Sequence, residues 1–143
     1  MEVDALRVKE KFAFVEKYVA FTRRFLTAKK DLTKWDLEVD IQAQRLFEII
    51  SQVFLDVGTH IIAHSKNVAP PSTYAECMLK LAEIGIIAKN DAEKYAKLAQ
   101  MRNIIAHNYM TIDRSKLQDG LREIIKDIDS FRKAVFHWLD TKQ

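Results

Sequence analysis

The sequence has little of what strands, elaborate loops and covalent cross-links require. It contains 3 glycines and 2 prolines in 143 residues, so a fold rich in tight turns has little raw material. Its one cysteine, Cys77, cannot form a disulfide within the chain. There is no secretion-signal pattern and no run of some 18 apolar residues. We therefore expect a reduced, cytoplasmic protein with no membrane partner.

The chain also has no strong excess of one charge. Its 23 basic and 20 acidic residues are interspersed and give a net charge of +3. This excludes the overwhelmingly basic surface of a non-specific nucleic-acid binder, but it neither indicates nor excludes an RNA substrate. The length suits a single domain over residues 1–143 with a substantial core.

Apolar residues recur at helical spacing throughout, which predicts an all-α fold, a five-helix up-and-down bundle. The first helix spans about 3–27, and its broad apolar face suits contact with neighbours on two sides, within a bundle or across a dimer. Three pairs resemble capping boxes that open the next three helices: Thr33 with Asp36, Thr73 with Glu76, and Asn90 with Glu93. The second helix runs to about Asn67, and the third stops at Gly85.

The fourth and fifth helices have distinct faces. Alanines on one side of the fourth helix would let another backbone come close. The last helix follows Thr111 to Asp113 and keeps a four-three apolar alternation, which we interpret first as core and only second as a dimer seam. That alternation comprises Leu117, Leu121, Ile124, Ile128, Phe131, Val135 and Trp138.

Polar residues interrupt the fourth helix near its end, in the segment Met101-Arg102-Asn103-Ile104-Ile105-Ala106-His107-Asn108-Tyr109. Arginine offers a permanently charged planar fork suited to phosphate, and histidine exchanges protons near neutral pH. Cleavage of RNA through its own 2′-hydroxyl needs a base, a proton for the leaving oxygen and positive charge on the phosphate. Arg102 and His107 could supply these needs without a metal ion.

Arg102 through Tyr109 has the pattern R-x4-H-x-Y with Asn directly after the Arg, and it resembles the signature of HEPN ribonucleases in their HepT-like toxin form. Further similarity covers roughly residues 35 to 135, whereas the first helix matches only in kind. It includes the Pro-Pro-Ser-Thr-Tyr segment at 70 to 74, Gly85-Ile86-Ile87, the stretch from Leu98 to Tyr109, and Ile112-Asp113.

The resemblance implies a toxin of a type VII toxin-antitoxin pair, a metal-independent endoribonuclease whose site combines two copies of the motif in a homodimer. It implies that Arg102 and His107 are catalytic, with Asn103 as a supporting residue. It also implies an antitoxin partner, an MntA-like minimal nucleotidyltransferase that adenylylates Tyr109. No cofactor is implied.

Other interpretations of the whole motif stay open from the residues alone. The main alternative is a non-catalytic HEPN nucleotide-binding or scaffolding module beside a nucleotidyltransferase; a purely structural helical adaptor would leave the polar residues unexplained. Arg102 and Asn103 could simply cap a helix end and pair with an acidic residue. Tyr109 could be a half-buried aromatic whose hydroxyl is hydrogen-bonded.

Two histidines on the second helix, His60 and His64, are four residues apart, a spacing that can bind one metal ion. No third ligand is evident, so we predict no metal and prefer a hydrogen bond between Asp56 and His60. The alternative is that His60 lines the nucleotide cleft behind the catalytic residues. We interpret Cys77 as a packing residue and His137 as a surface residue.

Overall fold

The computed structural model describes residues 3–141, and within that range it contains helices and no strand. Six α-helices and two short 3-10 helices follow one another along the chain. They are α1 (Ala5–Ala28), η1 (Leu32–Lys34), α2 (Leu37–Ala63), α3 (Tyr74–Ile84), α4 (Lys89–Ala96), α5 (Leu98–His107), η2 (Tyr109–Thr111) and α6 (Arg114–Thr141). Lys97, which separates α4 from α5, keeps helical backbone angles. The pair is thus the predicted fourth helix with one break, and the five-helix prediction is confirmed.

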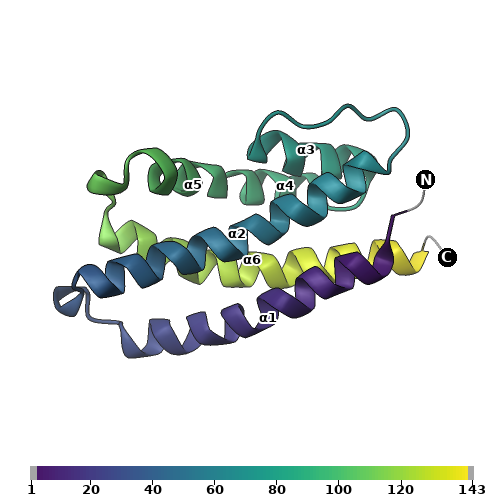
Figure 1. Cartoon of the computed structure of the whole chain (residues 1–143). Helices are drawn as coiled ribbons and strands as arrows, with labels where there is room; N and C mark the ends of the chain where they lie inside the picture. The colour runs from purple at the N-terminus through teal and green to yellow at the C-terminus, as the bar shows by residue number, and fades with distance from the viewer. Residues whose placement is uncertain (1–2, 142–143) are drawn as a thin grey trace.

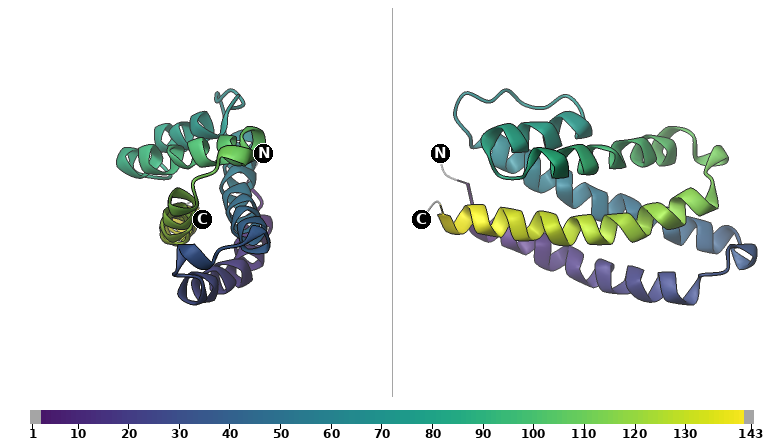
Figure 2. Two further views of the ribbon diagram at one scale, coloured as in Figure 1. Left: turned by 90° about the vertical axis from the view of Figure 1, so that its left-hand side faces the viewer. Right: turned by 180° about the vertical axis from the view of Figure 1, so that it is seen from behind.

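α1, α2 and α6 pack against one another as a three-helix bundle (Figures 1 and 2). α3, α4 and α5 cover α2 and α6 on the side away from α1. α1 begins and α6 ends at one end of the bundle, whereas α5 and η2 meet α6 at the other end. The end of α5, with His107, and η2 therefore lie at the end of the bundle opposite the beginning of α1.

Side-chain caps begin α1, α2 and α3, and two of the predicted helix starts were wrong. Asp4 caps α1, Asp36 caps α2, and Thr73 caps α3. The prediction that Thr33 opens the second helix was wrong, because Thr33 belongs to η1, whose cap is Asp31. The predicted start at Asn90 was also wrong: α4 begins one residue earlier at Lys89, and no side chain caps it. Glu76 accepts a hydrogen bond from the Ser72 backbone, which completes the cap of α3.

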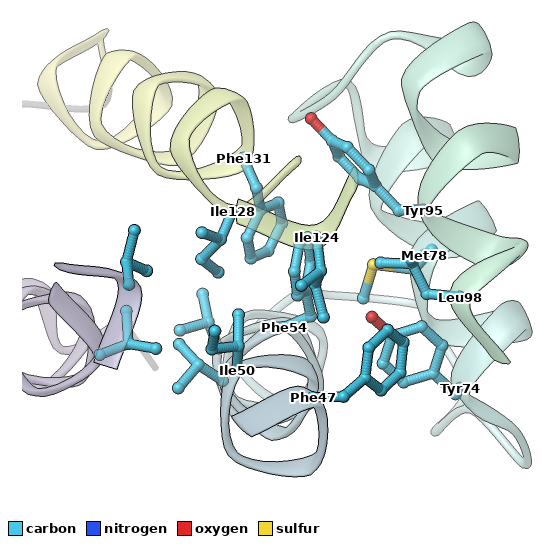
Figure 3. Close-up of a cluster of buried hydrophobic side chains, with 14 of the residues drawn as sticks. Phe47, Ile50, Phe54, Tyr74, Met78, Tyr95, Leu98, Ile124, Ile128 and Phe131 are labelled. Atoms are coloured by element: carbon cyan, nitrogen blue, oxygen red, sulfur yellow. The ribbon is translucent and has the colours of Figure 1, made fainter. Parts of the chain in front are cut away.

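The core lies among α1, α2 and α6 and between α2, α6 and the covering helices, and it is built from aromatic and branched side chains (Figure 3). Phe54 of α2 stacks on Phe131 of α6 with ring centroids 4.7 Å apart. The whole four-three set of α6 is buried, which confirms its interpretation as core. On α1, by contrast, Phe14 and Phe21 remain 45% and 44% exposed. The bundle therefore uses only part of the broad apolar face of α1.

Close packing of α2 against α3 depends on Gly58. A β-carbon at Gly58 would lie 2.6 Å from Cys77 Sγ, closer than real contacts allow. Cys77 itself is fully buried, as predicted, whereas His137 is exposed. The absence of a side chain at residue 58 therefore sets how closely α3 approaches α2.

α2 is the one helix within residues 3–141 that is long and apolar enough to cross a bilayer. However, 56% of its most apolar window is buried inside the bundle. It lies between α1 and the group of α3, α4 and α5, in contact with α1, α3, α5 and α6. Its apolar character is that of a central core helix.

Candidate active site

The predicted catalytic motif lies on α5, which two buried side chains anchor to the bundle. Leu98 at its start and Ile105 near its end are both buried, and the helix packs on α2, α4 and α6. The Asn108 N–H donates to the Ile104 carbonyl and ends the helix just after His107. The motif thus occupies the last two turns of a short helix whose opposite side is fixed in the core.

Arg102 is half-buried and lies against α2 and the start of α3. Its Nη1 donates to Ser51 Oγ and its Nη2 donates to Gln52 Oε1, both at 3.3 Å. Its guanidinium carbon lies 4.7 Å from the centre of the Tyr74 ring. Within residues 3–141 it makes no ion pair, although the carboxylates of Glu48 and Asp56 line the same groove. The guanidinium is therefore held in place by uncharged groups.

Asn103 and His107 lie on a different side of α5. They are four residues apart, and both side chains are exposed and without a hydrogen-bond partner in the described part of the chain. His107 follows Arg102 by five positions, which turns their side chains about 140° apart on an α-helix. Within one chain, then, Asn103 and His107 share a face, and Arg102 points elsewhere.

Tyr109 opens the short helix η2 directly after α5. Its side chain lies outside the part that the structure describes, so the predicted modification site is placed by its backbone alone. Met110, the next residue, is 87% exposed. η2 thus carries the motif tyrosine at the same end of the bundle as His107 (Figure 1).

A groove of about 700 Å³ runs beside Arg102 between α1, α2 and α5. Its basic lining residues are Arg7, Lys11, Arg45 and Arg102, and its acidic ones are Glu10, Glu48 and Asp56. Arg45 pairs with Glu48, and Lys11 pairs with Asp56. These pairs offset much of the charge in the groove, whereas the positive charge of Arg102 has no acidic partner within residues 3–141.

Asp56 and His60 lie close to this groove, but the hydrogen bond predicted between them is not formed. Asp56 Oδ1 instead accepts a hydrogen bond from Gln52 Nε2 at 2.8 Å. His60 Nε2 accepts from the backbone N–H of Asp4, which leaves that nitrogen occupied. Partial burial, followed by the neighbouring His64 and Arg7, lowers the pKa of His60. Asp56 is therefore linked to Arg102 by two hydrogen bonds through Gln52. His60 instead contacts the residues that begin α1.

The proposed metal alternative for His60 and His64 gains no third ligand from the fold. The rings are 4.4 Å apart, and His64 Nδ1 hydrogen-bonds to the His60 carbonyl. In the described residues no cluster of three or more His, Cys, Asp or Glu side chains could hold a metal ion. The pair is explained by local contacts on α2.

Sequence reasoning missed the three residues that hold Arg102: Ser51, Gln52 and Tyr74. Ser51 did leave a signal, because it is a polar residue in the buried series Phe47, Ser51, Phe54 and Gly58 on α2. A serine at such a position needs a partner. Gln52 and Tyr74 left no comparable signal, since an exposed glutamine and an apolar-packed tyrosine are common on helices.

A family model agrees with the resemblance that the motif indicated. The model described as "Ribonuclease HepT-like" matches residues 15–135, so the similarity includes most of α1. The expectation that the first helix matches only in kind was therefore too narrow. Among characterised proteins, the "tRNA nuclease HepT" of Aphanizomenon flos-aquae is 21% identical over 115 residues, 80% of this chain and 78% of that protein.

Solved structures share the fold at low sequence identity. YutE of Bacillus subtilis, described as a cytosolic protein, superimposes with a TM-score of 0.79 at 20% identity over 98% of this chain and 93% of its own. The tri-AMPylated HEPN toxin of Shewanella oneidensis, solved in complex with its MNT antitoxin, gives 0.80 at 15% identity over 91% and 96%. Because the family model extends from within α1 to within α6, this all-helical chain belongs to the HepT-like ribonuclease family.

Proposed function

We propose that this protein is the toxin of a type VII toxin-antitoxin pair and a metal-independent endoribonuclease. The observation that carries the proposal is Arg102, whose half-buried guanidinium is fixed by neutral partners and keeps its charge for an anion. A phosphate group suits that planar fork better than any protein group nearby. His107 and Asn103, exposed on the same helix, are free to contact RNA.

In the proposed reaction the ribose 2′-oxygen attacks the adjacent phosphorus, and the bond from phosphorus to the 5′-oxygen breaks. A base removes the 2′-hydroxyl proton, an acid protonates the leaving 5′-oxygen, and a 2′,3′-cyclic phosphate forms. His107 serves in one of these two roles, and Arg102 stabilises the negative charge on the phosphate. Asn103 orients His107 or a phosphate oxygen.

We propose that the complete site combines two copies of the motif in a homodimer. Arg102 and His107 point to different sides of α5, so one chain by itself presents an incomplete pair. Exposed apolar side chains occur at the end of the bundle that carries His107 and η2, notably Met110, Leu37 and Ile41, at 87%, 72% and 57% exposure. Such side chains favour an interface between copies.

Regulation by an antitoxin completes the proposal. The similar Shewanella toxin is AMPylated and bound to an MNT antitoxin, which supports an MntA-like minimal nucleotidyltransferase as the partner of this chain. We propose that it adenylylates Tyr109, placing a bulky anionic group beside the phosphate site at Arg102. We also propose that residues 1–143 form one domain that acts in the cytoplasm.

The test is cleavage of transfer RNA and total RNA by the purified protein in excess EDTA. We expect the parent protein to cut and to leave cyclic phosphate ends, and we expect His107→Ala and Arg102→Ala to lose at least about 100-fold in rate. His137→Ala and Arg24→Ala, both at exposed positions outside the motif and outside the groove beside Arg102, serve as matched controls and should retain activity.

Two results would contradict the proposal. One is 3′-hydroxyl products, or cleavage abolished by the chelator. The other is an inactive parent protein whose intact mass shows no AMP, which would favour a non-catalytic nucleotide-binding or scaffolding module.

A further inference from the structure

The surroundings of Arg102 differ from those of the other arginines that bond to side chains. Arg45, Arg114, Arg122 and Arg132 each pair with a carboxylate, whereas Arg102 is bonded to Ser51 and Gln52 and lies over Tyr74. A carboxylate in place of any of these neutral partners would compete with a bound anion. The following inference rests on the proposed role of Arg102 at the phosphate.

Ser51 presents a lone pair to Arg102 because its proton is already used. The side chain is fully buried, and its Oγ donates to the Glu48 carbonyl at 3.1 Å. The same oxygen accepts from Arg102 Nη1. A hydroxyl whose donor is engaged can only act as an acceptor here, so it fixes one edge of the guanidinium without adding charge.

Gln52 separates Arg102 from a carboxylate. Its Nε2 donates to Asp56 Oδ1 at 2.8 Å, and this contact turns the amide oxygen, Oε1, toward Arg102 Nη2. Asp56 in turn lies 3.6 Å from Lys11 Nζ of α1. The negative charge of Asp56 thus orients the amide and is offset by Lys11, while the group that touches Arg102 is neutral.

Tyr74 supplies the flat surface beneath the guanidinium. It is the first residue of α3, directly after the Thr73 cap, and it packs against Phe54 at 6.5 Å between ring centroids. Figure 3 shows its ring in the core beside Phe47, Met78 and Leu98. Its hydroxyl has no hydrogen-bond partner within residues 3–141, so the ring face is the part that acts on Arg102.

We propose that Gln52 and Tyr74 are positioning residues for the proposed phosphate-binding arginine. Tyr74 fixes the plane of the Arg102 guanidinium, and Gln52 holds its edge while keeping the Asp56 carboxylate one side chain away. Their shared effect is an arginine that is rigid and still fully charged when the RNA phosphate arrives. Such an arrangement reduces the reorganisation needed on binding.

The test compares two nearly isosteric charge changes on α2. Gln52→Glu places a carboxylate against Arg102, whereas Gln44→Glu adds the same charge two turns earlier, outside the groove. The Nε–H signal of Arg102, assigned by its loss in Arg102→Lys, is followed by NMR during titration with inorganic phosphate. We expect phosphate to move this signal in the parent and in Gln44→Glu, and to have little effect in Gln52→Glu.

Cleavage kinetics give the second measurement. Gln52→Glu should lower kcat/KM about tenfold or more, while Gln44→Glu stays within about twofold of the parent. A Gln52→Glu protein that binds phosphate and cleaves RNA like Gln44→Glu would overturn the role assigned to Gln52.

The role of Tyr74 is tested by removing its aromatic ring. Tyr74→Leu should move the Arg102 Nε–H signal toward that of an exposed arginine and lower the cleavage rate, whereas Tyr74→Phe keeps the ring and should restore both. An Arg102 signal that is unchanged in a folded Tyr74→Leu protein would overturn the role of Tyr74. If the parent cleaves no RNA but these signals respond as expected, the ribonuclease proposal fails and the positioning proposal stands.

Discussion

Two charged residues beside the α4–α5 helix pair, Asp127 and Arg102, have different kinds of partner. Asp127 of α6 is fully buried, and Lys94 of α4 places its ammonium 3.2 Å from one carboxylate oxygen. Arg102 of α5 is half-buried and has only neutral partners within residues 3–141. One charge is compensated by an opposite charge from the protein, and the other is not.

The comparison indicates that the Asp127 charge takes part in stabilising the fold, whereas the Arg102 charge is available to a ligand. An unpaired charge in a protein interior is costly, so Asp127 depends on Lys94 for its stability. Arg102 avoids that cost by partial exposure and by hydrogen bonds to neutral groups. This comparison predicts that the two sites respond in opposite ways when their partners or charges are removed.

The largest expected effect on stability is that of Lys94→Met. It leaves the Asp127 carboxylate buried without a counter-charge, so the free energy of unfolding should fall by about 2–3 kcal/mol near neutral pH. Denaturant unfolding followed by circular dichroism measures it. Lys97→Met, at an exposed position between α4 and α5, is the control. An equal, small loss in both variants would show that the Asp127 pair contributes little.

A smaller loss of stability is expected from Arg102→Met. The partners that it frees, the Gln52 amide and the Ser51 hydroxyl, are neutral, and the cation–π contact is modest, so we expect about 1 kcal/mol. The same denaturant titration measures it, and RNA cleavage should be lost in this variant. A loss as large as that of Lys94→Met would mean that Arg102 is chiefly structural, and it would contradict the distinction drawn between Arg102 and Asp127.

The smallest effect at neutral pH is expected from Asp127→Asn, which removes the buried charge and keeps the shape. The change in unfolding free energy should stay below about 1 kcal/mol, because replacing a buried charge with a neutral group can be nearly neutral. Its distinguishing feature is pH dependence. Burial, opposed by Lys94, raises the pKa of Asp127 above its ordinary value.

The sign of that dependence follows from the raised pKa. Between the ordinary and the raised value, folded Asp127 retains a proton that the unfolded chain has lost, so stability falls as pH rises through this window. Asp127→Asn should remove this part of the pH profile, and Lys94→Met should enlarge it. An Asp127→Asn protein whose stability profile parallels that of the parent at every pH above the ordinary pKa of an aspartate would contradict the assignment.

Much of the fold was predictable because helical periodicity and caps are local signals. The four-three spacing of α6 identified its buried side, and Thr73 identified the start of α3. The misplaced starts at Thr33 and Asn90 have a local cause. Asp31 competes as a cap for a short 3-10 turn, and α4 begins without a side-chain cap, which no capping pattern reveals.

Only the part of the site that lies within one short segment of the sequence was predictable. Arg102, Asn103 and His107 were found because they interrupt an apolar helix within a few residues of each other. The partners of Arg102 lie on α2 and at the start of α3, some 50 and 28 positions away along the chain, and only the fold brings them together. The prediction of an Asp56–His60 hydrogen bond failed because helical spacing permits a contact but does not exclude another partner. Gln52, four residues before Asp56, donates to its carboxylate instead.

The placement of the chain ends has a practical consequence for all of these experiments. α1 begins and α6 ends at the end of the bundle opposite His107 and η2 (Figure 1). A helix as long as α2, which runs between the two ends, spans about 40 Å. A purification tag, a surface anchor or a fluorophore joined after α6 would thus sit at the end of the bundle opposite His107 and η2. One joined before α1 would begin close to Arg7, which lines the groove beside Arg102, so the end of α6 is the better point for immobilising or labelling the protein.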